Sequence, residues 1–360
     1  MTMILSVATG VLVVFTLLPL WRNPHWLVRA LDFPRLQIAL CAILLLLALL
    51  TQLDRITPAA WGLVAVTSAC LMWQLWWIIP YTRLWPVEVL AANNIHSDRR
   101  IRIITANVLM TNRNAAPLIE LVKRHRPHIL VTLESDRWWQ DRLDSLQPEM
   151  PYSIKCPLDN LYGMHVYSRL PLDESEITYL IEDDKPSMHA LVTMRSGDVV
   201  RMHFVHPAPP SPTENAESAE RDAELIIVAR SVATSRHAVI VTGDLNDVAW
   251  SSTTRLFRKI SGLLDPRVGR GMFNTFHAHY PFMRWPLDHV FHSDHFTLGA
   301  IERLPPIGSD HFPLFIELAY TPAQAAKQTG LDADADDHER ARSIAAKQGG
   351  DAEDVPRPGE

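Results

Sequence analysis

The chain has 360 residues, of which 48% are hydrophobic, and its formal net charge is −6 at pH 7. This length allows one large domain with accessory segments. The acidic balance gives no reason to expect a nucleic-acid-binding protein that is held by bulk positive charge. The three cysteines lack the spacing of a disulfide framework or of a cysteine metal site, so both classes are excluded.

Three apolar segments open the chain, at residues 4–20, 36–53 and 59–79. Each approaches the roughly 20 residues that a helix needs to cross a bilayer, and tryptophans lie near the segment ends, as in an interfacial belt. The first segment lacks the features of a cleaved signal peptide. Three buried helices of a soluble protein would need a very large core. We therefore predict a membrane domain at residues 1–80 with three transmembrane helices.

Arginine counts in the loops predict the orientation of these helices. Arg22, Arg29 and Arg35 lie between the first two apolar segments. Only Arg55 lies between the second and third, and Arg83 follows the third. With three spans, the first loop and the C-terminal domain share a side of the membrane. The bias predicts an integral protein of the inner or plasma membrane with its C-terminal domain in the cytoplasm.

The rest of the chain divides by composition into three parts. We expect a short juxtamembrane linker at residues 81–98, a mixed α/β domain at 99–320, and a disordered polar tail at 321–360, because the tail is poor in large apolar residues. Strand-like patterns are at residues 101–106, 128–133, 165–168, 189–194, 199–205, 239–242, 287–291 and 313–318, and helix-like patterns at 116–126, 216–235 and 252–260.

Polar side chains stand at the ends of six of the strand-like runs. These are Asn107, Glu134, His206, Asp244 with Asn246, Asp288, and Asp310 with His311. Each cluster alone has an ordinary explanation as a turn or a strand exit. Together they supply the acid, amide and imidazole groups that a metal-assisted phosphate-ester hydrolase needs.

The chemistry of single residues supports this interpretation. The Glu134 carboxylate suits a hard cation, Mg²⁺ or Mn²⁺. Asp244 and Asn246 are two residues apart and share a face if the strand continues. The Asp244 carboxylate can then orient or deprotonate a water while the Asn246 amide donates to a phosphate oxygen. A carboxylate that holds His311 charged would provide a donor for the developing oxyanion, and either Asp310 or Asp288 could do so.

The order of these motifs resembles the endonuclease/exonuclease/phosphatase superfamily, which contains DNase I-like nucleases, inositol-polyphosphate 5-phosphatases and neutral sphingomyelinases. The similarity covers about residues 99–318. The matching segments are TANVL, PHILVTLESD, YGMHVYSRLPL, FVHPAPP, VTGDLND, PLDHVF and GSDHFPL. The resemblance implies a fold of class α/β: a four-layer α/β sandwich of two packed mixed sheets flanked by helices, with the site at one sheet edge.

The resemblance also implies roles and a Mg²⁺ (or Mn²⁺) cofactor. Glu134 would ligate the metal, Asn107 and Asp310 would lie near metal or phosphate, Asp244 would position the nucleophilic water, Asn246 and His206 would contact phosphate together with Asn107, and Asp288 and His311 would act as a pair. Leu109 stands where some members carry a carboxylate, which weakens a two-metal interpretation.

Neighbouring histidines compete for some of these roles. His203 is a rival for the role of His206, which we prefer because it ends the strand and precedes a proline-rich turn. His289 follows Asp288, but the alternation of side chains along a strand points it away from that carboxylate. We expect His289 to be structural.

The substrate stays open between three hypotheses. The leading one is a membrane-anchored, divalent-metal-dependent phosphodiesterase or phosphomonoesterase, whose partners are the lipid bilayer and a lipid or lipid-linked phosphate ester, because a short linker keeps the site near head groups. The second is an endonuclease or exonuclease acting on DNA or RNA, although no dense basic run appears between residues 99 and 320. The third is a catalytically silent membrane scaffold, against which the complete residue set argues.

Overall fold

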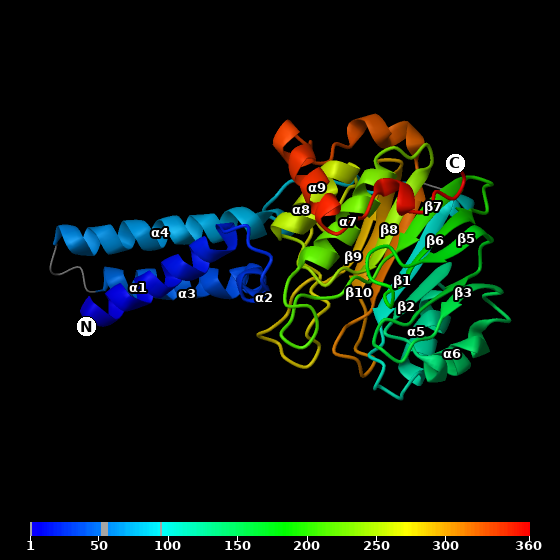
Figure 1. Ribbon diagram of the computed structural model, residues 1–360, viewed down its shortest axis with the longest axis horizontal. Coiled ribbons are helices and arrows are strands. Elements are labelled where there is room, and N and C mark those ends of the chain that lie inside the picture. The colour runs from blue at the N-terminus through cyan, green and yellow to red at the C-terminus, as the bar shows by residue number, and fades with distance from the viewer. Residues whose placement is uncertain (1, 52–56, 94–95) are drawn as a thin grey trace.

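The protein consists of a helical N-terminal part and a larger α/β domain, from which the helices project to one side (Figure 1). The structure is a computed structural model that describes residues 2–51, 57–93 and 96–360. Arg55 and the last two residues of the second apolar segment lie outside the described residues.

Two mixed β-sheets form the centre of the α/β domain. The first contains, in spatial order, β10 (Phe296–Arg303), β11 (Leu314–Tyr320), β1 (Arg100–Asn107), β2 (Ile129–Leu133), β4 (Met164–Ser168) and β3 (Tyr152–Cys156). The second contains β5 (Leu172–Thr178), β6 (Ser187–Thr193), β7 (Val199–Phe204), β8 (Ala238–Asp244) and β9 (Asp288–His292). The β1–β2 and β7–β8 pairs are parallel and the other pairs are antiparallel.

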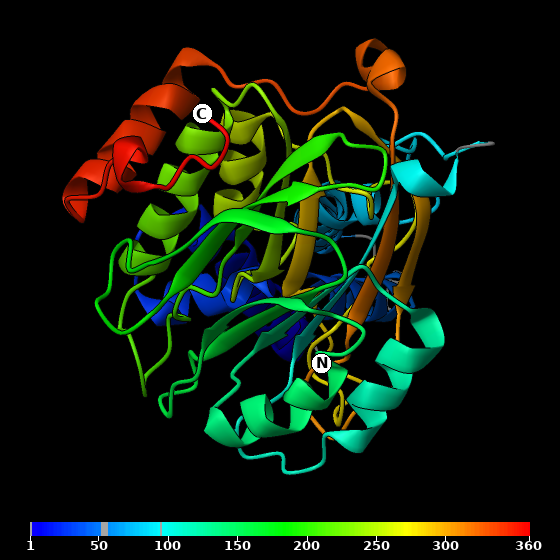
Figure 2. The same ribbon diagram turned by 90° about the vertical axis from the view of Figure 1, so that its right-hand side faces the viewer.

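Helices cover the outer face of each sheet. The first sheet is covered by α5 (Ala116–His125) and α6 (Arg137–Leu143), and the second by α7 (Ala219–Val232), α8 (Ser252–Ser261) and α9 (Ala335–Lys347) (Figure 2). Alternation along β1 explains the layering, because Ile101 and Ile103 lie in the core between the sheets whereas Ile104 and Ala106 pack against the helices. The predicted α/β sandwich of two packed mixed sheets is confirmed.

Among the described residues of the α/β domain, the strands β3, β5 and β10 and the helices α6 and α9 were not predicted. β5 has the sequence LDESEIT on a sheet edge, with a register shift between Asp173 and Glu176, so it lacks the apolar alternation of a half-buried strand. β10 carries a register shift between Leu298 and Ala300, which breaks its periodicity. β3 and α6 are short, at five and seven residues.

The N-terminal part contains the apolar helices α1 (Thr2–Leu17), α3 (Arg35–Leu50) and α4 (Pro58–Ile78), which run side by side, and the short α2 (Trp26–Arg29) at their junction with the domain (Figure 1). Met3–Leu20 and Pro58–Tyr81 are long and apolar enough to cross a membrane. A third span results if Trp26–Asp32 and Arg35–Leu50, which meet at a 68° bend, count as one. Among the described residues, two helices, or three if the bent pair counts as one, could thus serve as the predicted spans.

The loop between α1 and α3 lies directly against the α/β domain. The backbone N–H of Trp26 donates to the carbonyl of Ala216 (2.9 Å), and the indole N–H of Trp250 donates to the carbonyl of Asp32 (2.9 Å). The expectation that this loop and the domain share one end of the helices therefore agrees with the structure. Arg29 and Arg35 both pair with the buried Asp32, so two of the arginines used to predict orientation have a structural role.

Residues 81–98 do not form a loose linker. The Tyr81 hydroxyl donates to the carbonyl of Ala249 (2.6 Å), and the Glu88 carboxylate accepts from the buried Arg258 (2.6 Å). Val89 is fully buried in the core between the sheets. The segment is therefore part of the domain, because its apolar and charged side chains fill places that the strands leave open. Residues 94–95 lie outside the described residues.

The predicted disorder of residues 321–360 is wrong. The chain forms α9, whose N-cap Asp334 accepts a hydrogen bond from the N–H of Asp337 (2.9 Å). Ala341 and Ala345 are buried against α7 and α8 together with Val355. The segment folds although it has few large apolar residues. Its alanines, one helical turn apart, let α9 approach the neighbouring helices closely.

Candidate active site

The predicted polar clusters meet at one edge of the sandwich, where β1, β2 and β8 end and β9 begins. A hydrogen bond between the hydroxyls of Thr105 in β1 and Thr242 in β8 (2.8 Å) joins the two sheets. Asn107 and Asp244 follow these threonines by two residues and so share their faces. The threonine pair therefore fixes the distance at which the site residues of the two sheets face each other.

Asn107 lies between two carboxylates. Its amide nitrogen donates to Glu134 Oε1 (2.7 Å) and to Asp244 Oδ2 (3.2 Å), and its Oδ1 accepts from the N–H of Leu109 (3.1 Å). Asn107 thus holds a residue of each sheet in place. With its donor nitrogen towards both carboxylates, it acts here as a positioning residue, and its role as a metal or phosphate ligand stays a prediction.

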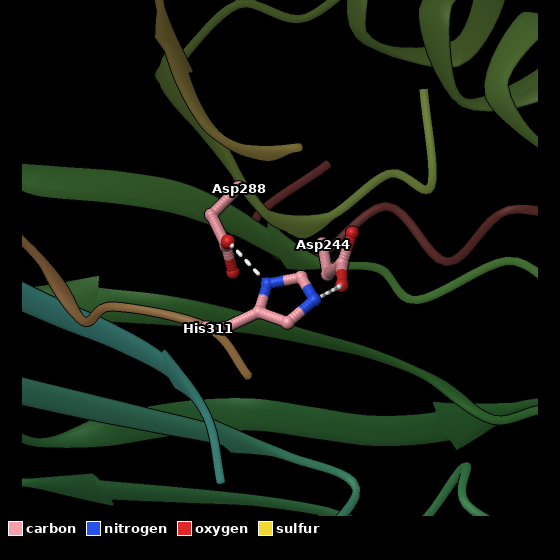
Figure 3. Close-up of side chains that lie close together, drawn as sticks. All are labelled: Asp244, Asp288 and His311. Carbon is pink, nitrogen blue, oxygen red and sulfur yellow. Dashed lines mark hydrogen bonds and ion pairs between the residues drawn. The ribbon is translucent and has the colours of Figure 1, made fainter. Parts of the chain in front are cut away.

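Asp244, Asp288 and His311 form a buried row (Figure 3). Asp244 and Asp288 are direct partners in the antiparallel β8–β9 pair, so the ladder itself brings their side chains together. His311 lies between them, with Nδ1 at 2.8 Å from Asp288 Oδ2 and Nε2 at 3.5 Å from Asp244 Oδ2. Of the two carboxylates considered as partners for His311, Asp288 makes the close contact.

The charges of this row depend on one another. Burial alone would lower the pKa of His311, but the carboxylates of Asp288 and Asp244 raise it to about 10. Burial raises the pKa of Asp244, while the positive charge of His311 opposes that rise. The row therefore contains an imidazolium held between carboxylates near neutral pH.

Glu134 is the first residue after β2 and has a left-handed backbone, with φ of 55°. Burial raises the pKa of its carboxyl to about 7, against the hydrogen bond from Asn107 and the charge of His311, and the Asp310 carboxylate adds to the rise. Its Oε2 is buried without a hydrogen-bond partner among the residues that the structure describes. A buried carboxylate oxygen that no protein group satisfies is suited to an external cation.

His206 and Asn246 stand beside the row. The His206 ring lies against Tyr162, with ring centroids 5.2 Å apart, and burial lowers its pKa to about 4, against the pull of Asp244. Asn246 adopts a φ of 50°, its N–H donates to Asp244 Oδ1 (2.9 Å), and its side chain donates to the carbonyl of Pro207 (3.0 Å). Asn246 thus links Asp244 to the turn that follows His206.

Asp310 lies at the rim of the site. Its carboxylate accepts from the hydroxyl of Ser309 (3.3 Å), and its backbone carbonyl accepts from the N–H of Ala278 (2.6 Å). It is close enough to Glu134 to affect its pKa. All eight predicted site residues therefore occupy one region. Among the described residues, the side chain of Asp310 makes no hydrogen bond to any of the other seven.

The rival histidines lie elsewhere. Nδ1 of His203 is 2.6 Å from Nδ1 of His189, and both rings are buried within the second sheet. His289 points away from Asp288, with Nε2 at 2.9 Å from the carbonyl of Asp247 and Nδ1 at 2.6 Å from Arg267. The structural interpretation of His289 is confirmed, and of the two rivals His203 and His206 only His206 lies at the site, where the Asp244 carboxylate acts on its pKa.

Three residues near the site were missed. The Thr275 hydroxyl accepts from the N–H of Asp288 (3.1 Å), the Phe276 ring lies 4.9 Å from that of His311, and Tyr162 contacts His206. None of them ends a strand-like run. Thr275 and Phe276 belong to a stretch without regular helix or strand, where no periodic pattern marks a residue as close to the site.

Two sets of side chains suit a metal ion. By spacing, Asp244, Asp288 and His311 form a group that could hold a cation, since their ligand atoms lie within 4.8 Å of one another. Both nitrogens of His311, however, face carboxylates, which raise its pKa and so favour the protonated ring, and a protonated ring has no lone pair for a cation. The unpartnered Glu134 Oε2 is the better candidate and agrees with the preference of Mg²⁺ for carboxylate oxygen.

The fold of two packed mixed sheets, with acidic and imidazole groups at one edge, is the arrangement that the order of the motifs predicts for a phosphate-ester hydrolase. The model of the Endonuclease/Exonuclease/phosphatase family matches residues 104–311, more than half of the chain. The chain belongs to this family.

Solved structures share the fold at low sequence identity. An endonuclease/exonuclease/phosphatase from Beutenbergia cavernae has 16% identity and a TM-score of 0.51, with 62% of this chain and 72% of that chain covered. D. rerio TDP2, solved in complex with a single-strand DNA product, has 17% identity and a TM-score of 0.50, covering 61% and 98%. An endonuclease/exonuclease/phosphatase from Bacteroides vulgatus has 17% identity and a TM-score of 0.50, with 61% of this chain and 99% of that chain covered. Comparison with curated proteins gave no significant match.

Proposed function

We propose that this protein is a membrane-anchored, divalent-metal-dependent phosphoesterase that hydrolyses a phosphodiester or phosphomonoester of a lipid or lipid-linked substrate. The observation that carries the hydrolytic part is the buried row of Asp244, His311 and Asp288, with Asn107 joining Asp244 to Glu134. A structural domain has no need of an imidazolium between two buried carboxylates, because burying such charges costs free energy.

Each residue has a role that its contacts support. Asp244 has one oxygen within 3.5 Å of His311 and accepts from the N–H of Asn246, so it is fixed to orient a water for attack on phosphorus. His311, charged and held by Asp288, donates to a phosphoryl oxygen or to the leaving oxygen. We assign contact with the phosphate to His206 and Asn246, which stand beside the row.

Glu134 would hold the cation, Mg²⁺ or Mn²⁺, with Asp310 and Asn107 nearby. When bound, such an ion neutralises charge on the phosphoryl oxygens and stabilises the leaving oxygen. The protein's part is to keep the Glu134 carboxylate in one orientation, which the hydrogen bond from Asn107 does.

A lipid or lipid-linked substrate is supported by the junction between the two parts of the protein. Trp250 and Tyr81 bind the helices and the following segment directly to the α/β domain. If the apolar helices cross a bilayer, a domain attached in this way stays at the head-group level. We also propose the cytoplasmic side for the domain, on the basis of the arginine bias, with Arg22 and Arg83 outside the buried Asp32 cluster.

A substrate panel tests the proposal on the full chain in nanodiscs. Phosphoinositides, sphingomyelin, a lipid-linked pyrophosphate, p-nitrophenyl phosphodiesters and supercoiled plasmid are each offered with Mg²⁺, Mn²⁺ or EDTA. We expect lipid turnover that needs the metal and falls on the order of 10²-fold in His311→Gln. His295→Gln, a half-exposed histidine outside the site, is the matched control.

The other outcomes separate the alternatives. Plasmid nicking that His311→Gln abolishes, without lipid turnover, would identify a nuclease. No turnover of any substrate by a folded protein would favour the catalytically silent scaffold.

A further inference from the structure

Three large apolar side chains project into solvent from one loop beside the site. In the segment 277–284, the exposed fraction is 59% for Tyr280, 87% for Phe282 and 52% for Met283. Single exposed apolar residues are ordinary, but three within four positions form a contiguous tip. Nothing in the proposed chemistry uses this tip.

Backbone hydrogen bonds hold the loop in a defined shape. The N–H of His277 donates to the carbonyl of Met283 (2.9 Å), and that of Met283 donates to the carbonyl of Tyr280 (3.0 Å). The Arg284 guanidinium donates to the carbonyl of Ala278 (3.1 Å). The apolar tip is therefore presented by a closed loop.

The same loop forms part of the wall of the candidate site. Its Ala278 N–H donates to the carbonyl of Asp310 (2.6 Å), and the preceding Phe276 ring lies 4.9 Å from the His311 ring. A surface that binds this loop thus lies next to the entrance of the site.

The loop also contacts the first turn of an apolar helix. The side-chain amide of Gln37, two residues into α3, donates to the backbone carbonyl of Phe282 (2.7 Å). At the base of the loop, the rings of Trp285 and Phe33 meet edge to face at 5.6 Å. The yellow loop lies at the end of the domain from which the helices project (Figure 1). The backbone of Phe282 therefore lies beside the start of α3.

We propose that the 277–284 loop inserts Tyr280, Phe282 and Met283 into the boundary between head groups and acyl chains of the bilayer that contains the apolar helices. Aromatic side chains at the start of a membrane helix favour this boundary. Just after α4, Leu84 and Trp85 are two further exposed apolar side chains, at 86% and 41%. The proposal rests on the proposed membrane anchoring, and it directs the site towards phosphate esters at the lipid surface.

A lipid surface is the occupant that the contacts favour over a protein partner. The tip is continuous with the apolar helices through Gln37, so a membrane around α3 reaches Phe282 without any rearrangement. A partner protein at the same place would have to compete with lipid.

Depth-dependent quenching tests this directly on the full chain. Cys41, Cys70 and Cys156 are replaced by serine, one new cysteine is labelled with an environment-sensitive nitrobenzoxadiazole dye, and the protein is reconstituted into vesicles of phosphatidylcholine and phosphatidylglycerol with or without brominated acyl chains. The label goes at Phe282→Cys. We expect a blue-shifted emission that brominated lipid quenches at least twofold.

Two control positions separate the possible failures. Leu44→Cys, 67% exposed in the middle of α3, reports on anchoring, and Tyr152→Cys, 41% exposed at the start of β3, reports on the aqueous part. Quenching at 44 but not at 282, with 282 behaving like 152, overturns the loop proposal and leaves the anchoring intact. No quenching at position 44 overturns the membrane anchoring and, with it, the loop proposal. Both results are independent of whether the protein hydrolyses a phosphate ester, because only fluorescence is measured.

Discussion

Gly243, one residue before Asp244 in β8, lies against the backbone of Val205, the residue that follows β7. Its φ is +153°, and a Cβ added there would come 1.9 Å from the carbonyl oxygen of Val205. Backbone cannot move away from such a contact cheaply, so only glycine lets Asp244 reach its position.

We predict that Gly243→Ala destabilises the protein by about 2 kcal/mol or more and lowers hydrolysis, because both β7 and Asp244 must shift. The matched control is Gly197→Ala, which also has a positive φ (+87°), but whose added Cβ would have no heavy atom of the described residues within 4 Å apart from its chain neighbours. Thermal unfolding of both variants measures the difference. Equal losses in the two would mean that the close approach to Val205 does not matter.

A second residue gives a pH dependence outside the site. Glu224 is buried in α7, and burial raises its pKa from 4.5 to about 8, with the charge of Glu182 adding to the rise. Between these two values the folded state binds more protons than the unfolded state, so this carboxyl lowers the stability progressively as pH rises from about 4.5 to about 8.

Glu224→Gln removes that penalty. We expect a gain in unfolding free energy on the order of a few kcal/mol at pH 8 and a much smaller gain at pH 5, measured as the shift in melting temperature at each pH. Glu120→Gln, on the exposed face of α5, serves as the control and should leave the melting temperature unchanged at both pH values. A gain of the same size at both pH values would show that the Glu224 carboxyl does not titrate as described.

At the scale of elements, α9 is the least expected part of the fold. Ala341 and Ala345 are each 1% exposed and face α7 and α8, whereas the adjacent Ala346 is exposed. We predict that Ala345→Glu destabilises the protein by about 2 kcal/mol or more, since it places an unpaired charge in a close helix contact, and that Ala346→Glu stays within about 0.5 kcal/mol. Chemical denaturation of both variants distinguishes a packed helix from a free tail, for which the two losses would be equal.

The elements that the sequence predicted share one property, a strong local pattern. β1, β2 and β8 are apolar runs that end in a polar residue, and this pattern both marked the strands and located Asn107, Glu134 and Asp244. β5 and α9 lack it, because one is a polar edge strand and the other packs through alanines. Their positions depend on contacts with distant segments, which local periodicity does not record.

The candidate site also has features that the sequence predicted and features that depend on contacts between distant segments. The residue types and their order predicted which groups meet, but the choice of Asp288 over Asp310 as the partner of His311 follows from the β8–β9 register. The contribution of Thr275 depends on a loop conformation that no sequence pattern indicates.

At the scale of the whole molecule, the segment after α4 joins the helices to the α/β domain. Arg258 is 3% exposed, and Glu88 from this segment is its close carboxylate partner, at 2.6 Å. Glu88 also accepts from the N–H of Asp265 (2.9 Å). A fragment that starts at residue 99 would leave the Arg258 charge without Glu88.

We predict that Glu88→Ala in the full chain costs about 3–5 kcal/mol, because it leaves a buried guanidinium uncompensated. Glu317→Ala breaks a more exposed pair with Arg100, whose side chain is 33% exposed, and should cost less than about 1 kcal/mol. Melting temperatures in detergent compare the two. Similar small losses would mean that the segment at 81–98 is a linker after all.

The proposed hydrolysis depends on a divalent cation at Glu134. Isothermal titration of the full chain with Mg²⁺ tests the binding of this cation most directly. We predict that the wild type and Glu120→Gln bind Mg²⁺ alike, and that Glu134→Gln weakens binding at least tenfold while the protein stays folded. Mg²⁺ binding that is unchanged in Glu134→Gln, or no binding by the wild type in the presence of a phosphate ester, would contradict the account.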